Sequence, residues 1–132
     1  MRLLFAGTPS IALPALGMLN EQQEVVGVLT APDKPGKRGK DSVPSPVKTL
    51  AEELSLPVLQ FERLGSEARE EVTPLAPELL VVAAYGKIFG PKFLSLFSSG
   101  GITLHPSLLP LHRGPSSMQE TILSGDETAG VT

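Results

Sequence analysis

The 132-residue sequence contains no cysteine and no tryptophan, and it has only one tyrosine and two histidines. Without cysteine the chain can form neither a disulfide nor a cysteine-ligated metal site, which is compatible with a reducing cytoplasm, where we expect the protein to reside. The apolar run after Met1 stops at Gly7, too early for a signal peptide, and no run approaches the roughly 20 residues of a membrane span. We therefore expect no contact with a membrane.

The net charge of the chain is also small. Eleven basic residues against 14 acidic ones give a formal net charge of −3, so the chain as a whole offers no reason to expect binding of DNA or RNA. Any contact with a nucleic acid must come from a local patch. Apolar residues make up 41% and charged residues 19% of the chain, a balance typical of one globular domain with a real core.

Short apolar runs without polar alternation recur along the chain and alternate with segments of helical periodicity. Such runs are typical of strands covered on both faces of a parallel sheet. The predicted strands are 2–6, 25–29, 56–59, 78–84 and 102–104, with another beginning at 130–132, and the predicted helices lie within 8–19, 45–54, 67–72, 91–97 and 116–123. This order predicts an α/β fold with a doubly wound, mostly parallel sheet and helices on both faces.

The first strand-to-helix turn is Gly7-Thr8-Pro9. It lacks the Gly-x-Gly-x-x-Gly spacing of a dinucleotide-binding loop, which argues against a nicotinamide- or flavin-dependent dehydrogenase.

The segment 30–46 is rich in proline, glycine and positive charge. Lys34, Lys37, Arg38 and Lys40 place four positive charges within seven positions. Two interpretations stay open on this pattern: a solvated surface loop, or a mobile basic finger that contacts a phosphate backbone. In an otherwise acidic chain this segment is the best candidate for holding RNA.

Both histidines lie in the stretch 100–114, which follows a predicted strand. Thr103 and His105 are two positions apart on an extended segment, so their side chains point to the same face. An imidazole in that place can donate to a developing oxyanion or take a proton from an amine, although a purely structural histidine fits the pattern equally well. His112 receives no role. Two histidines seven residues apart with no nearby carboxylate are not a metal-ligand set, and we expect no metal.

Five stretches occur in order over nearly the whole chain: Leu-Leu-Phe-Ala-Gly-Thr-Pro at 3–9, the basic loop at 32–40, Pro-Ser-Pro-Val-Lys at 44–48, Val-Ala-Ala-Tyr-Gly at 82–86, and the stretch 105–114 with its His-Pro-Ser-Leu-Leu-Pro. Together they resemble the folate-dependent formyltransferases. The Ala-Gly-Thr-Pro motif and the basic loop resemble in particular the branch that acts on methionyl-tRNA.

The resemblance implies a Rossmann-like catalytic domain that transfers a formyl group from 10-formyltetrahydrofolate to the amino group of methionyl-initiator-tRNA. It also implies that residues 1–132 are the N-terminal part of that domain, cut before the aspartate of the family and without its β-barrel domain. Two alternatives stay open: a formyltransferase for a small amine, such as glycinamide ribonucleotide or an amino sugar, and a non-catalytic folate-binding module.

The resemblance also implies roles for single residues. His105 becomes the catalytic histidine, and Thr103 occupies the place of the family's asparagine, where its hydroxyl can still donate one hydrogen bond. A lost oxyanion donor typically costs about a hundredfold in rate. The implied folate-site residues are Ser107, Leu108, Leu109, Pro110, Tyr85 and Gly86, and the implied contacts with the tRNA acceptor end are Lys34, Lys37, Arg38 and Lys40.

Overall fold

The computed structural model describes residues 1–39 and 41–132. Lys40, one of the four expected tRNA contacts, lies outside the described residues. The chain divides into two compact units, Met1–Ile102 and Thr103–Thr132, which are described in turn. No helix in the described part of the chain is both long and apolar enough to cross a membrane.

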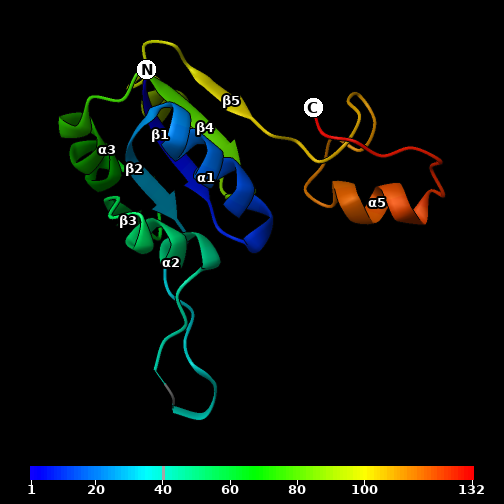
Figure 1. Cartoon of the computed structure of the whole chain (residues 1–132), viewed down its shortest axis with the longest axis horizontal. Coiled ribbons are helices and arrows are strands. Elements are labelled where there is room, and N and C mark those ends of the chain that lie inside the picture. Colours follow the sequence, from blue (N-terminus) through cyan, green and yellow to red (C-terminus); the bar gives the residue numbers. More distant parts are fainter. Residues whose placement is uncertain (40) are drawn as a thin grey trace. The chain divides into compact units, whose positions relative to one another are not determined.

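One sheet organises the structure (Figure 1). It consists of β1 (Arg2–Gly7), β2 (Glu24–Thr30), β3 (Val58–Gln60), β4 (Leu79–Ala83) and β5 (Gly101–Thr103), in the order β3-β2-β1-β4-β5. Strand β1 pairs in parallel with β2 and β4, and β2 pairs in parallel with β3. The strand order reverses between β1 and β4, and ligands bind at the carboxyl ends of the strands at such a point. The predicted α/β fold is confirmed.

Helices cover both faces of the sheet. In the first unit these are α1 (Leu13–Gln22), α2 (Pro46–Glu53), α3 (Ser66–Val72) and the short α4 (Pro91–Leu94). The second unit contains its own helix, α5 (Ser117–Leu123). Strand β1 shows how the core divides, because Leu3 and Phe5 belong to one buried cluster with residues of α1 and α2. Leu4 and Ala6 belong to the other cluster, with residues of α3 and α4. Alternate side chains of one strand thus serve two apolar layers.

Helix α2 begins where the sequence predicts. The backbone N–H of Lys48 donates to the Ser45 hydroxyl at 3.0 Å, and Pro46 occupies the first turn, where its missing N–H costs little. Helix α1 begins later than expected, because a 3-10 turn, η1 (Ser10–Ala12), precedes it and no side chain caps it. Pro14 still falls in its first turn. The expected cap Thr8 forms other hydrogen bonds instead.

Two further expectations need correction. The helix predicted over 91–97 ends at Leu94. Residues 130–132 form no strand in the described structure. Thr132 exchanges two backbone hydrogen bonds of 2.8 Å with His105, which is the pattern of an antiparallel pair.

Candidate functional site

Thr8 joins the carboxyl ends of three strands in the first unit. Its backbone N–H donates to the Ala84 carbonyl at 3.1 Å, and its hydroxyl donates to the Tyr85 carbonyl at 3.3 Å. The same hydroxyl accepts from the Ala31 N–H at 3.3 Å, and the Thr8 carbonyl accepts from the Val47 N–H at 3.3 Å. One residue after β1 thus fixes the chain that leaves β2, the chain that leaves β4 and the start of α2.

Gly7 makes this close approach possible. A Cβ atom at this position would lie 2.7 Å from the Ala83 carbonyl oxygen and 3.0 Å from the Ala12 Cβ. Neither is the far end of a flexible side chain, so a larger residue would push β1 and β4 apart at the reversal point.

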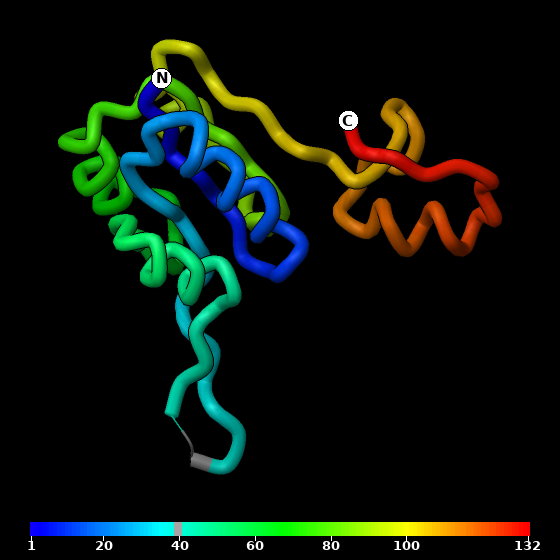
Figure 2. The backbone as a smooth tube through the Cα atoms, in the orientation of Figure 1, coloured from blue at the N-terminus to red at the C-terminus, as the bar shows by residue number. Residues whose placement is uncertain are grey.

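The basic loop has a fixed root. Lys34 and Val43 exchange two backbone hydrogen bonds of 3.0 and 2.8 Å, which close the loop (Figure 2). Below this pair, the Asp33 carboxylate accepts from Gln60 Nε2 at 2.8 Å and from Lys48 Nζ at 2.9 and 3.1 Å. The hydrogen bonds from Gln60 and then from Lys48 lower the pKa of Asp33 below its ordinary value. The root is therefore held by a charged network.

Beyond the root, the loop carries exposed positive charge. The side chains of Lys34, Lys37 and Arg38 are all exposed, and none forms an ion pair within the described residues. A hollow of about 330 Å³ lies where the loop meets the sheet, and its lining includes Thr8, Pro9, Pro32, Lys34, Val43 and Pro44. The exposed cations and the carboxyl edge of the sheet thus belong to one part of the first unit.

Tyr85 lies inside the core rather than in an open pocket. Its side chain is only 4% exposed, and its ring stacks on Phe89 with centroids 5.4 Å apart. Among the described residues its hydroxyl has no hydrogen-bond partner, and burial raises the pKa of Tyr85 to about 12. Lys87 fixes the following turn, since its Nζ donates to the carbonyls of Phe61 and Glu62. Gly86 is exposed, with a φ of 93°.

In the second unit, the ring of His105 is held by the backbone. Its Nε2 lies 2.9 Å from the His112 carbonyl oxygen. Because a carbonyl oxygen only accepts hydrogen bonds, Nε2 carries the proton in this contact. Thr103, at the end of β5, is exposed.

The expected folate residues Ser107, Leu108, Leu109 and Pro110 follow His105, and they differ in what they expose. Ser107 is 1% exposed, and its hydroxyl donates to the Leu111 carbonyl at 2.7 Å, so the hydroxyl is committed to the turn. Leu108 and Leu109 are 43% and 45% exposed. The stretch therefore offers apolar surface rather than a free hydroxyl.

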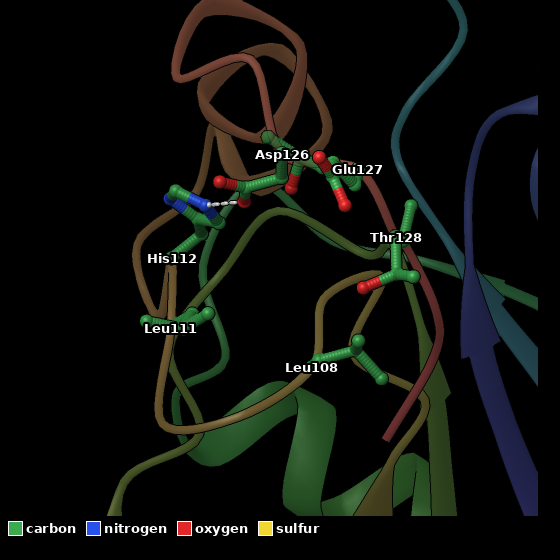
Figure 3. Close-up of a pocket in the computed structure, with 8 residues that line it drawn as sticks. Leu108, Leu111, His112, Asp126, Glu127 and Thr128 are labelled. Atoms are coloured by element: carbon green, nitrogen blue, oxygen red, sulfur yellow. Dashed lines mark hydrogen bonds and ion pairs between the residues drawn. The ribbon is translucent and has the colours of Figure 1, made fainter.

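A contact between a histidine and a carboxylate lies at the end of this turn (Figure 3). His112 Nε2 is 2.6 Å from Asp126 Oδ2, the contact drawn as a dashed line in the figure. His112 Nδ1 is 3.6 Å from Glu120 Oε2. The sequence does not predict this contact, because the partners His112 and Asp126 are 14 positions apart and the turn around Asp126 has an ordinary turn composition. The only sequence feature that indicated a role for His112 was that both histidines lie in the stretch 100–114. The described residues include no cluster of three or more His, Asp or Glu side chains suited to a metal ion.

The sheet and its helices define an α/β domain, and the family follows from comparison. The family model described as formyl transferase matches residues 1–132, and the chain belongs to this family. The predicted resemblance is thereby confirmed.

Curated relatives narrow the comparison further. The methionyl-tRNA formyltransferases of Treponema denticola and Borrelia recurrentis are 45% and 46% identical to the whole chain, and that of Thermotoga neapolitana is 46% identical. The chain spans only 43–44% of the length of these relatives.

Solved structures share the fold at lower identity. Phosphoribosylglycinamide formyltransferase from Bacillus halodurans matches with a TM-score of 0.78 and 22% identity, covering 100% of this chain and 70% of that one. A formyltetrahydrofolate deformylase from Pseudomonas syringae matches with a TM-score of 0.73 and 18% identity, covering 99% of this chain and 44% of that one. At such identities the likeness shows the fold alone.

Proposed function

We propose that residues 1–132 belong to the N-terminal catalytic domain of a methionyl-tRNA formyltransferase, a cytoplasmic enzyme of translation initiation. The observation that carries this proposal is the 45–46% identity to enzymes of that name, which extends over every element of the chain. The phosphoribosylglycinamide formyltransferase from Bacillus halodurans shares the fold at 22% identity.

The proposed reaction joins the methionine amino nitrogen to a formyl carbon. The bond from that carbon to N10 of the folate breaks, and one proton passes from the amine to N10. 10-Formyltetrahydrofolate supplies the formyl group when it is bound. In this reaction His105 moves the proton, and the exposed Thr103 hydroxyl donates a hydrogen bond to the negative charge that develops on the formyl oxygen.

The described residues fit the folate in part. In the second unit, Leu108, Leu109 and Pro110 expose apolar surface that can cover a flat heterocycle. In the first unit, Gly86 is exposed, so a ligand can approach its backbone. Ser107 and Tyr85 contribute differently from what the resemblance implies. The hydroxyl of Ser107 holds the turn, and the ring of Tyr85 packs in the core. We propose that neither residue contacts the folate through its hydroxyl.

The basic loop supports tRNA as the acceptor. Lys34, Lys37 and Arg38 expose their charges on a loop with a fixed root, and Lys40 extends the same run in the sequence. Each phosphate that such a residue neutralises adds affinity that falls as the salt concentration rises. A small amine substrate would make no use of this loop.

The test is binding of initiator methionyl-tRNA by the 132-residue chain over a range of salt concentrations. The variant Lys37→Ala/Arg38→Ala should lower the affinity about tenfold or more at low salt and reduce the slope of log K against log salt by about 1 to 2. The matched control Arg63→Ala/Lys92→Ala removes two exposed charges elsewhere in the first unit and should leave both quantities unchanged. Equal binding by both variants would refute a role of the loop in tRNA recognition.

A further inference from the structure

We propose that His112 is a positioning residue for His105. Two carboxylates hold the His112 side chain, and its main-chain carbonyl holds Nε2–H of His105, which leaves Nδ1 of His105 as the nitrogen that exchanges protons with the substrate. The inference rests on the proposed catalytic role of His105.

One ring nitrogen of His105 has a defined protonation state. The 2.9 Å contact between His105 Nε2 and the His112 carbonyl requires a proton on Nε2. In the neutral ring, the lone pair available to a base then lies on Nδ1. A side-chain partner that both donates and accepts would have left the tautomer open, whereas a carbonyl does not.

The backbone conformation and the side-chain contacts of His112 hold its carbonyl in place. His112 has a φ of 51°, in the left-handed region that non-glycine residues adopt only when the surrounding structure holds them there. Its side chain is 16% exposed and lies between Asp126 at 2.6 Å and Glu120 at 3.6 Å. Glu120 belongs to α5, and Asp126 follows the turn at Gly125 that comes after this helix, so the two anchors lie on α5 and shortly after it. Figure 3 shows the contact with Asp126. The loop is thereby tied to α5.

A second contact holds the residue before His112. The hydroxyl of the buried Ser107 donates to the Leu111 carbonyl at 2.7 Å. Two successive carbonyls of the loop thus accept from side chains that lie two positions apart at the strand tip. Only the contact at His112 involves His105, and only His112 is anchored by carboxylates.

The arrangement gives His105 a defined sequence of proton transfers. Nδ1 accepts the proton that the attacking amine loses and returns it to N10 of the folate as the carbon–nitrogen bond breaks, while Nε2–H stays on the His112 carbonyl throughout. The ring need not rotate between the two transfers.

The decisive measurement is the 15N NMR spectrum of the histidine rings in the 132-residue chain. The chain has only two histidines, and the His112→Asn variant assigns them while keeping a residue that tolerates positive φ. We expect His105 of the unmodified chain to be the Nε2–H tautomer at a pH where it is neutral. Finding the Nδ1–H tautomer instead would overturn the proposal, whatever the variants do.

The variants then test the role of the anchor. In Asp126→Ala and in His112→Asn we expect His105 to become a mixture of tautomers, with kcat for formyl transfer reduced about tenfold and KM for the folate donor unchanged. Glu127→Ala is the matched control, since Glu127 lines the same hollow of about 180 Å³ and forms none of these contacts. An Asp126→Ala chain with an unchanged His105 spectrum would contradict the inference.

The tautomer of His105 can be measured in the absence of folate and tRNA. The proposed catalytic role of His105 fails separately, if His105→Ala keeps the fold and retains full formyl transfer. The two failures are therefore distinguishable.

Discussion

At the scale of single residues, Tyr85 carries a buried hydroxyl without a hydrogen-bond partner among the described residues. A buried polar group without a partner costs free energy that an apolar replacement of the same shape does not. We expect Tyr85→Phe to raise the free energy of unfolding by about 1 kcal/mol, measured by urea unfolding at neutral pH. Folate binding should not change, because the ring lies in the core. A less stable Phe variant would show that the hydroxyl has a partner.

The same residue predicts how stability changes at high pH. Burial raises the pKa of Tyr85 to about 12, whereas an unfolded tyrosine ionises near pH 10. The folded state therefore binds the Tyr85 hydroxyl proton more tightly than the unfolded state does. The stabilisation that results is complete below about pH 10 and is lost as the pH rises toward 12. The advantage of Tyr85→Phe should grow over this range. Since Tyr85 is the sole tyrosine, an absorbance titration follows it directly.

At the scale of structural elements, the Asp33 network is expected to stabilise the base of the basic loop. Asp33 accepts hydrogen bonds from Gln60 and Lys48, and the Lys34–Val43 pair lies directly above it. We expect Asp33→Asn to speed amide hydrogen exchange at Lys34 and Val43. The control Asp41→Asn alters an exposed loop carboxylate and should leave both amides as they are.

The effect of Asp33 depends on pH in a defined direction. Because its pKa in the folded chain lies below the ordinary value, the folded state binds this proton more weakly than the unfolded state does. The stabilisation of the folded state by the Asp33 carboxylate is thus complete above about pH 4 and is lost as the pH falls through the lowered pKa. The difference in the free energy of unfolding between the original chain and Asp33→Asn should shrink in that pH range. A constant difference down to the lowest pH would contradict the proposed network.

The elements themselves were predictable to different degrees. Strands β1 and β4 are continuous apolar runs, and α2 has Ser45 and Pro46 at its start, so local composition was sufficient to place them. The start of α1 was not predictable in this way, because Thr8 bonds to residues after β2 and β4 instead of capping a helix. Residues 130–132 have strand-like composition, but a strand also needs a partner along its length.

At the scale of the whole molecule, the apolar core is confined to the first unit. Both buried apolar clusters consist of residues between Leu3 and Phe97. In the second unit the buried residues are Ser107, Ser117 and Thr121, while Leu108, Leu109 and Leu111 are exposed. We expect native-state hydrogen exchange to show the highest protection in β1, β2 and β4, and clearly lower protection throughout 103–132. Equal protection of the two units would show that the second unit is stabilised by contacts beyond its own.

The fold class and the family of this chain could be predicted from its amino-acid sequence, which also indicated His105 and the basic loop as candidate functional residues. The physical reason is that apolar runs, turn residues and ordered motifs are local patterns. Only the tertiary structure decided that Thr8 joins three strand ends, that Tyr85 packs in the core, and that His112 lies between Glu120 and Asp126. These contacts join residues far apart in the chain, and their geometry exists only once the backbone has folded.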